Sequence, residues 1–299
     1  MSKFDEDIRR RFQVQPGKRF RLKDHDPGWS GDETLSKEER KEAALAFLSE
    51  DVQDLIRVQD LLYASRTWSV LIILQAMDAA GKDGTIKHVM SGVNPQGCRV
   101  HSFKKPSEEE LSHTFLWRCS RVLPERGQIA IFNRSYYEEV LVVRVHPQWL
   151  AAQRLPDFTE PDRAFWQARY EDINQFEQHL VRNGTAVVKF FLHISAEQQR
   201  KRLLDRLNDP DKLWKFSTAD LAERQHWDAY MEAYEEALAA TSTEWAPWYV
   251  IPANHKWVAR ATVARIITNV LDSLELEYPK VSDEAKRDLD RAREQLEAE

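Results

Sequence analysis

Five short apolar segments predict the strands of a sheet. The longest, at 69–77, runs Ser-Val-Leu-Ile-Ile-Leu-Gln-Ala-Met with no alternation between apolar and polar residues. A run of this length with many branched side chains is typical of a strand buried on both faces of a parallel sheet. Four further strands are predicted at 99–103, 128–132, 185–194 and 248–251.

Helical patterns separate these strands. Apolar residues recur at three- and four-residue intervals in 36–62, and Ser107 with Glu110 forms a capping box that predicts a helix to about residue 122. Further helices are predicted at 162–182, after residue 195, at 217–240 and at 256–274. This alternation predicts a three-layer α/β/α fold with a mainly parallel five-stranded sheet.

The two ends of the chain differ from this middle part. Residues 1–35 contain two Pro-Gly turns and no clear periodicity, and they predict an irregular N-terminal arm. Residues 277–299 form a charged C-terminal tail, either a helix or a frayed end. The remaining residues, 36–276, are predicted to be one domain.

Composition narrows the class of protein. Of the 299 residues, 42% are apolar and 31% are charged, as in soluble enzymes. No apolar run approaches the roughly 20 residues that span a bilayer, and residues 1–23 lack the apolar core of a secretory signal. Cys98 and Cys119 are too few for a disulfide framework. We therefore expect a cytoplasmic protein without a membrane partner.

The net charge of −6 comes mostly from the C-terminal tail. Residues 272–299 contain ten acidic and five basic side chains, which leaves a net charge of −1 for the other 271 residues. A near-neutral body is not basic enough to predict binding of nucleic acid. It does permit local clusters of cations that bind a phosphorylated ligand.

A phosphate-binding loop is predicted between the first strand and the helix that follows it. The sequence at 76–85 supplies glycines for close backbone approach and a lysine for charge. The predicted phosphate-binding residues are Ala79, Ala80, Gly81, Lys82, Asp83, Gly84, Thr85 and Lys87. Ala76 and Asp83 replace the usual Gly and Ser/Thr, and Asp78 would repel phosphate unless a metal ion lay between them. The alternative is a tight turn with a chance Gly-Lys pair.

A second polar cluster follows the third strand, at the carboxyl edge of the sheet, where sites of α/β proteins form. Many phosphate-loop enzymes hold their metal ion with an Asp here, but this chain has the neutral Asn133. The metal ligands are therefore predicted to be Asp78 and Glu138, while Arg134 is expected to stabilise transferred phosphate. Asp78, Lys82, Arg134 and Glu138 are the candidate catalytic residues. The alternative is a helix cap with a surface ion pair.

A third cluster is the basic run at 200–215, with six basic and three acidic residues. Arg202 and Arg206 are four residues apart and share one face of the predicted helix. In a nucleotide kinase this region forms a mobile lid that brings cations over phosphates. We therefore predict a helical lid at about 200–226, with Arg202, Arg206, Lys212 and Lys215 as phosphate-binding residues. The alternative is a solvated helix face.

These segments together resemble the polyphosphate kinase 2 family. The resemblance rests on 77–84, 103–106, 116–118, 132–138, 208–210 and 246–250, which follow one another over most of the chain. It implies a P-loop kinase-like fold and reversible phosphoryl transfer between inorganic polyphosphate and nucleotides, with Mg²⁺ or Mn²⁺. Lys104, in the second of these segments, and Asn133 join the predicted phosphate- and nucleotide-binding residues. The family usually forms homo-oligomers, which implies a dimer or a tetramer.

Two positions place the chain within that family. Many members have Asp in place of Asn133 and Asn in place of Glu138. The paired exchange resembles the subgroup that accepts both nucleoside monophosphates and nucleoside diphosphates. It implies conversion of AMP to ADP and of ADP to ATP, with guanine nucleotides as further candidates, and it leaves the second metal ligand open.

Two other functions compete with this hypothesis. One is an ATP-dependent nucleoside or nucleotide kinase of the same fold, which Ala76 and Asp83 disfavour because that loop normally keeps Gly and Ser/Thr. The other is a non-catalytic module that binds nucleotides or polyphosphate. The presence of both Asp78 and Arg134 disfavours this second alternative.

Overall fold

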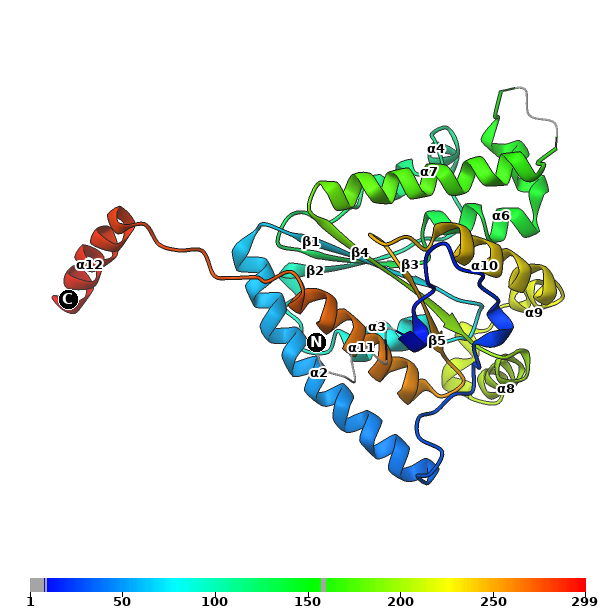
Figure 1. Ribbon diagram of the computed structural model, residues 1–299, viewed down its shortest axis with the longest axis horizontal. Coiled ribbons are helices and arrows are strands. Elements are labelled where there is room, and N and C mark those ends of the chain that lie inside the picture. The colour runs from blue at the N-terminus through cyan, green and yellow to red at the C-terminus, as the bar shows by residue number, and fades with distance from the viewer. Residues whose placement is uncertain (1–7, 9, 157–159) are drawn as a thin grey trace.

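A parallel five-stranded sheet forms the centre of the protein (Figure 1). The computed structural model describes residues 8, 10–156 and 160–299. The strands are β1 (Ser69–Gln75), β2 (Cys98–Ser102), β3 (Ile129–Asn133), β4 (Thr185–His193) and β5 (Trp248–Pro252), in the order β2-β3-β1-β4-β5. The five predicted strands are confirmed. Leu74 pairs with Asn133, so the carboxyl ends of β1 and β3 lie side by side.

Helices cover both faces of the sheet and confirm the three layers (Figure 1). One face carries α2 (Lys37–Ser65), α3 (Lys82–Val89) and α11 (Lys256–Asp272), and the other carries α7 (Arg163–Arg182) and α10 (Trp227–Thr241). Every residue of β1 is buried between these layers. The unbroken apolar pattern of this strand is explained by its central position.

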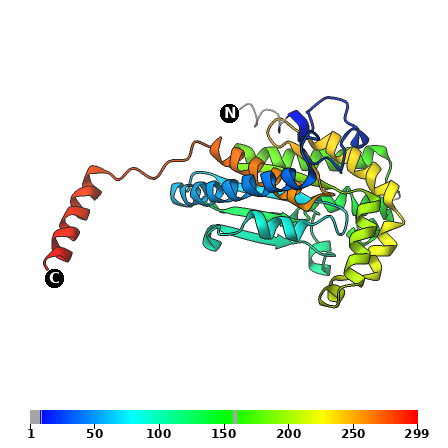
Figure 2. The ribbon, with the colours of Figure 1, turned by 90° about the horizontal axis from the view of Figure 1, so that it is seen from below.

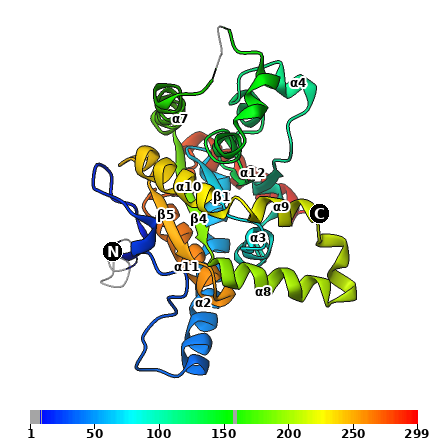
Figure 3. The same ribbon diagram turned by 90° about the vertical axis from the view of Figure 1, so that its right-hand side faces the viewer.

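The segment at 196–224 stands at the carboxyl ends of the strands (Figure 3). It consists of α8 (Ala196–Leu207), the 3₁₀ helix η5 (Pro210–Lys215) and α9 (Thr218–Arg224). The other short helices are η1 (Leu22–Asp24), η2 (Pro95–Gly97), α4 (Glu108–Leu111), α5 (Trp117–Ser120), η3 (Tyr136–Glu139), α6 (Val142–Val145) and η4 (Pro147–Gln153).

Two predicted helices are interrupted in the structure. The helix expected from residue 107 to 122 is split into α4 and α5, because Ser112 Oγ and His113 Nδ1 bond the carbonyls of Glu108 and Glu109 at 2.9 and 2.8 Å and so end the first turn. The helix expected at 217–240 is split into α9 and α10. At that break the amides of Gln225 and His226 bond carbonyls three residues earlier, which tightens the end of α9.

The N-terminal segment packs along the free edge of β5. The amide of Val14 donates to the carbonyl of Trp248 at 2.9 Å, and Gln13 forms an antiparallel bridge with Tyr249. Phe12, Val14 and Leu22 are buried. This irregular segment therefore contributes side chains to the core.

The C-terminal tail ends in a charged helix, α12 (Asp283–Glu297), with no buried residue. Figures 1 and 2 show it standing away from the domain at the end of an extended segment. Within the described residues no helix combines the length and the apolar character needed to cross a membrane.

Candidate active site

The phosphate loop turns tightly between β1 and α3. Lys82, the first residue of α3, is buried, and its Nζ donates to the carbonyl of Ala76 at 2.8 Å. Burial, assisted by the nearby charge of Arg134, lowers the pKa of Lys82. Gly81 has φ of 112°, which favours glycine, whereas Ala79 takes the left-handed region with φ of 61°. A left-handed alanine costs about 1 kcal/mol or more, so surrounding contacts must hold it.

Helix α8 supplies those contacts. Arg202 donates to the loop carbonyls of Ala79 and Ala80 at 3.0 and 2.7 Å, and to the carbonyls of Ala253 and Asn254, just beyond β5, at 2.6 and 3.0 Å. Gln199 Nε2 donates to the carbonyl of Asp78 at 3.0 Å. Arg202 therefore lies against the loop backbone in this structure. Burial, and after it the charge of Arg206, lower its pKa to about 10.

Arg134 lies between two carboxylates. Its guanidinium is 2.9 Å from Asp78 Oδ1 and 3.5 Å from Glu138 Oε2. Glu138 is the larger cause, and Asp78 a further one, of a raised pKa for Arg134. Arg134 also has φ of 64°, the left-handed region that only glycine adopts without cost. Strain of this kind collects at functional sites, and here it directs the side chain toward the loop.

Asn133 and Asp83 form a second contact across the site. Asn133 Nδ2 donates to Asp83 Oδ1 at 2.7 Å. Asp83 occupies the position of the usual Ser/Thr and would face another carboxylate if residue 133 were Asp. The neutral amide therefore lets the two residues bond instead of repelling each other.

The site could hold a divalent metal ion through Asp78 and Glu138. Both carboxylates contact the same guanidinium, Asp78 Oδ1 at Nη2 and Glu138 Oε2 at Nη1, so they flank one cationic group. No group of three or more His, Cys, Asp or Glu suited to a metal occurs among the described residues. Mg²⁺ is typically bound by one or two carboxylates, with water and substrate phosphates as the other ligands. This pair of oxygen donors fits that pattern.

A cavity of about 410 Å³ opens beside the loop, and we call it the loop cavity. Asp78, Arg134 and Glu138 form part of its wall. The rest of the lining includes acidic and apolar side chains as well as aromatic and basic ones, among the latter Phe115, Trp149, Tyr230, Tyr234, Lys104 and Arg118. Trp149 is 46% exposed. The lining thus combines charged and aromatic side chains, and we call the group around Trp149 and Tyr230, whose rings both lie near His146, the aromatic end.

Helix α9 closes one side of the loop cavity. Its Glu223 accepts a hydrogen bond from Tyr230 Oη at 2.5 Å and lies 2.8 Å from His146 Nε2. The ring of His146 stacks on Trp149 with the ring centroids 4.8 Å apart. The segment predicted as a lid therefore contacts the aromatic end of the cavity directly.

The opposite side of the loop carries cations. We name Arg206, Lys212, Lys256 and Arg260 the basic strip; they come from α8, η5 and α11. Burial, together with the charges of Arg202, Arg260 and Lys212, lowers the pKa of Lys256. A Cβ added at Gly84 would lie 3.4 Å from Arg260, so this guanidinium reaches the first turn of α3. Arg206 and Lys212 also form ion pairs with Asp220 and Asp209.

The structure places the predicted site residues in different parts of the molecule. Asp78, Lys82, Arg134 and Glu138 meet at the carboxyl ends of β1 and β3, as their mutual electrostatic influence shows. Lys104 lines the loop cavity, Thr85 is buried, and Lys87 is exposed on α3. Lys215 ends η5, and its side chain lies outside the described part of the structure.

Several site residues were not predicted. Gln199 lies one turn before Arg202, and Lys256 and Arg260 are four residues apart at the start of α11, so helical spacing alone was available as a signal. The aromatic end of the loop cavity gave no local signal. Trp149, Glu223 and Tyr230 come from three separate segments that only the fold brings together.

Known proteins resemble this chain over most of its length. The model of the family described as Polyphosphate kinase 2 matches residues 35–280. An "ADP-polyphosphate phosphotransferase" of Rhodopseudomonas palustris is 54% identical over 258 residues, which cover 86% of this chain and 89% of that protein. An "AMP/ADP-polyphosphate phosphotransferase" of Meiothermus ruber is 48% identical over 271 residues, covering 91% and 96% of the two chains.

A solved structure has the same fold. The crystal structure of Polyphosphate Kinase 2 from Arthrobacter aurescens TC1 superposes with a TM-score of 0.82 at 41% sequence identity. The superposition covers 93% of this chain and 94% of that chain. The similarity therefore extends over nearly the whole of both chains.

Proposed function

The chain belongs to the polyphosphate kinase 2 family, and from this premise we propose that it transfers phosphoryl groups between inorganic polyphosphate and nucleotides. The observation that carries the proposal is the arrangement around the phosphate loop. Arg134 and two carboxylates meet at the loop, with an aromatic cavity on one side and the basic strip on the other. One side suits a nucleotide, and the other suits a polyanion.

The nucleotide is assigned to the loop cavity. Aromatic side chains such as Trp149 offer a surface on which a base can stack, and Lys104 and Arg118 supply charge for phosphates. Polyphosphate is assigned to the basic strip, where cations from two helices and η5 lie close together; after burial, the charges of Arg202, Arg260 and Lys212 lower the pKa of Lys256. The two substrates then meet at Arg134.

The reaction breaks the terminal P–O bond of polyphosphate and forms a P–O bond to a phosphate oxygen of the nucleotide. Such a transfer depends mainly on positioning and charge stabilisation. Lys82 and the loop amides hold phosphate oxygens, while Arg134 stabilises charge on the transferred group. Asp78 and Glu138 would hold a divalent cation, which kinase-type transfer generally uses and which we propose to be Mg²⁺, with Mn²⁺ as a substitute. Bound there, the metal would neutralise phosphate charge.

Both AMP and ADP are proposed as acceptors. The relative from Meiothermus ruber is named for both nucleotides, and the relative from Rhodopseudomonas palustris is named for ADP. The contact between Asn133 and Asp83 distinguishes this loop from one with two carboxylates at these positions. Guanine nucleotides are further candidates, because the aromatic end of the loop cavity offers stacking, which every base accepts.

The test offers AMP, ADP, GMP and GDP separately with long-chain polyphosphate and Mg²⁺, and follows the phosphorylated product. We expect ADP from AMP and ATP from ADP, with Asp78→Asn as an impaired control. The mass of the purified protein would test the proposed dimer or tetramer in the same preparation. Turnover with ATP as the only effective donor would favour the ATP-dependent kinase, and no product from any acceptor would contradict the proposal.

A further inference from the structure

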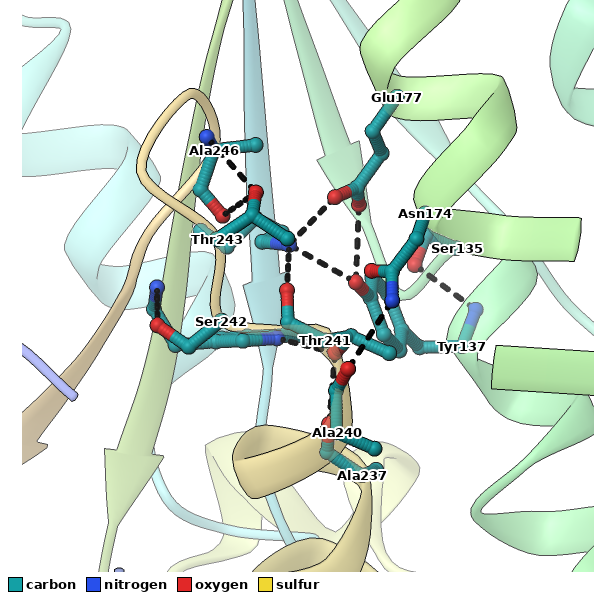
Figure 4. A network of polar contacts seen from close by, with 12 residues as sticks. Ser135, Tyr137, Asn174, Glu177, Ala237, Ala240, Thr241, Ser242, Thr243 and Ala246 are labelled. Carbon is teal, nitrogen blue, oxygen red and sulfur yellow. Dashed lines mark hydrogen bonds and ion pairs between the residues drawn. The ribbon is translucent and has the colours of Figure 1, made fainter. Parts of the chain in front are cut away.

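A fully buried ion pair lies behind the active site. Lys189 of β4 and Glu177 of α7 have no exposed side-chain surface, and Lys189 Nζ is 2.5 Å from Glu177 Oε2. The ammonium also donates to Tyr137 Oη at 2.9 Å and to the carbonyl of Thr241 at 2.7 Å. Glu177, Tyr137 and Thr241 thus point toward one another in the core (Figure 4). All three ammonium protons of Lys189 have acceptors.

This ion pair is bonded to the residues that follow Arg134. Glu177 Oε1 accepts from both Tyr136 Oη and Tyr137 Oη, each at 2.8 Å. The two tyrosines begin η3, which also contains Glu138. The two tyrosines therefore lie between Arg134 and Glu138 in the sequence, and these two residues carry charges of the site.

The other end of the network is fixed to the sheet and to α10. Trp248 Nε1 donates to Thr241 Oγ1 at 2.9 Å, and the ring of Trp248 packs edge-on against Tyr137 with centroids 4.7 Å apart. The network therefore joins β4, β5, α7 and α10 to η3. A shift of η3 would break hydrogen bonds to rigid elements on several sides.

Stability alone is a weak reason for this arrangement. Desolvation of two charges offsets much of their attraction, and apolar side chains of similar volume often stabilise a core as well. Apolar packing does not fix the position of two tyrosine hydroxyls, whereas a carboxylate that accepts from both does. Arg134 needs such control, because its left-handed conformation (φ 64°) persists only where the flanking structure enforces it.

We propose that Lys189 and Glu177 are positioning residues for phosphoryl transfer. Through Tyr136 and Tyr137 they hold η3, and η3 keeps Arg134 and Glu138 in place at the phosphate loop. This inference rests on the proposed function for its kinetic consequence. Its structural consequence, an ordered segment at 134–139, holds whatever the substrates are.

The main test uses the double variant Tyr136→Phe/Tyr137→Phe in the full chain. These replacements keep ring volume and leave Lys189 paired with Glu177, but they release η3 from the pair. We expect kcat to fall about 10- to 100-fold, as for a small misplacement of reacting groups, with KM for both substrates within about threefold. Lys189→Met/Glu177→Leu should lower kcat by a similar factor, because it disrupts the same unit.

Two comparisons separate positioning from general destabilisation. Asp51→Asn removes the buried carboxylate of another ion pair, Arg265–Asp51, whose arginine is partly exposed and which joins α2 and α11 on the opposite face, and it should leave kcat unchanged. In an Arg134→Ala/Glu138→Gln background the double tyrosine variant should cause little further loss, because the positioning acts through these two residues. Additive losses would contradict the proposal.

Amide hydrogen exchange gives a readout that needs no turnover. In the double tyrosine variant, protection of 134–139 should fall at least about tenfold while that of β1 is retained; Asp51→Asn should leave 134–139 unchanged. If the wild-type protein shows no turnover, the proposed function is rejected. Hydrogen exchange would still test whether the ion pair holds 134–139 in place. Unchanged exchange at 134–139, or kcat within twofold of wild type in an active enzyme, would overturn the inference.

Discussion

An arginine contacts the phosphate loop on each side, and the two arginines bind different kinds of acceptor. On the side of the loop cavity, Arg134 bonds the carboxylates of Asp78 and Glu138 and keeps 38% of its side chain exposed. On the side of α8, Arg202 bonds four backbone carbonyls and is buried. Carboxylates can exchange an arginine for a metal ion, whereas loop carbonyls cannot move without distorting the loop. The difference predicts chemistry for Arg134 and support for Arg202.

Replacing Arg134 should produce the largest kinetic effect. In Arg134→Ala we expect kcat to fall about 10²–10³-fold, the usual cost of removing one preorganised charge from a transition state. The free energy of unfolding should change little, because the side chain is partly exposed and the variant loses no core contact. Steady-state kinetics with ADP and polyphosphate measure the effect. Retention of near-wild-type kcat by folded protein would contradict the assignment.

Replacing Arg202 should instead lower stability. Arg202→Ala leaves four carbonyls around the loop without their donor, and a buried polar group without a partner costs about 1–3 kcal/mol. We expect a loss of about 3 kcal/mol or more, which lowers the Tm of a domain of this size by roughly 6 °C. Thermal unfolding measures the loss. The comparison fails if Arg202→Ala unfolds like wild type and loses only kcat.

The sequence predicts the loop and Arg134 better than it predicts the contacts of Arg202. The strands, the loop and Arg134 follow from local patterns, because an apolar run and a Gly-Lys turn have few alternative structures. The contacts of Arg202 do not follow, because its spacing from Arg206 predicts a shared helix face and says nothing about which carbonyls that face meets. The aromatic end of the loop cavity was unpredictable for the same reason. Its residues are distant in sequence and are brought together by α9, whose separation from α10 was also missed.

Within the loop cavity, Trp149 tests the assignment of the nucleotide. Loss of stacking between a base and an aromatic ring costs about 1–3 kcal/mol, so Trp149→Ala should raise KM for ADP about tenfold while KM for polyphosphate stays constant. Trp149→Phe keeps a ring and serves as the matched control. If the alanine variant raised KM for polyphosphate instead, the assignment of the two substrates to the two sides of the loop would have to be reversed.

On the other side, Arg260 tests the assignment of polyphosphate. A hydrogen bond to a charged group contributes about 1.5–3 kcal/mol when buried, and a half-exposed contact contributes less. Arg260→Ala should therefore raise KM for polyphosphate about fivefold and leave KM for ADP unchanged. Added salt should narrow the difference from wild type, because it screens exposed charges. An equal rise in KM for ADP would contradict the assignment of polyphosphate alone to the side of the loop that carries Arg260.

The smallest effect is expected at Asp220, which lies between the two sides. Its carboxylate is 3.5 Å from Arg206 of the basic strip. Burial is the larger cause, and the charge of Asp78 a further one, of its raised pKa. Asp220→Asn should free Arg206 and remove a negative charge from the path of polyphosphate. The pair is only partly buried and its 3.5 Å separation is long for an ion pair, so we expect a contribution below about 1 kcal/mol and a fall of about twofold in KM for polyphosphate.

The pH dependence of this effect has a definite sign. As pH falls toward the raised pKa of Asp220, the wild-type carboxyl takes up a proton and comes to resemble the neutral amide of the variant. The KM values of wild type and Asp220→Asn should therefore converge at low pH and separate as pH rises. A difference that grows as pH falls would show that Asp220 does not act through its charge on Arg206.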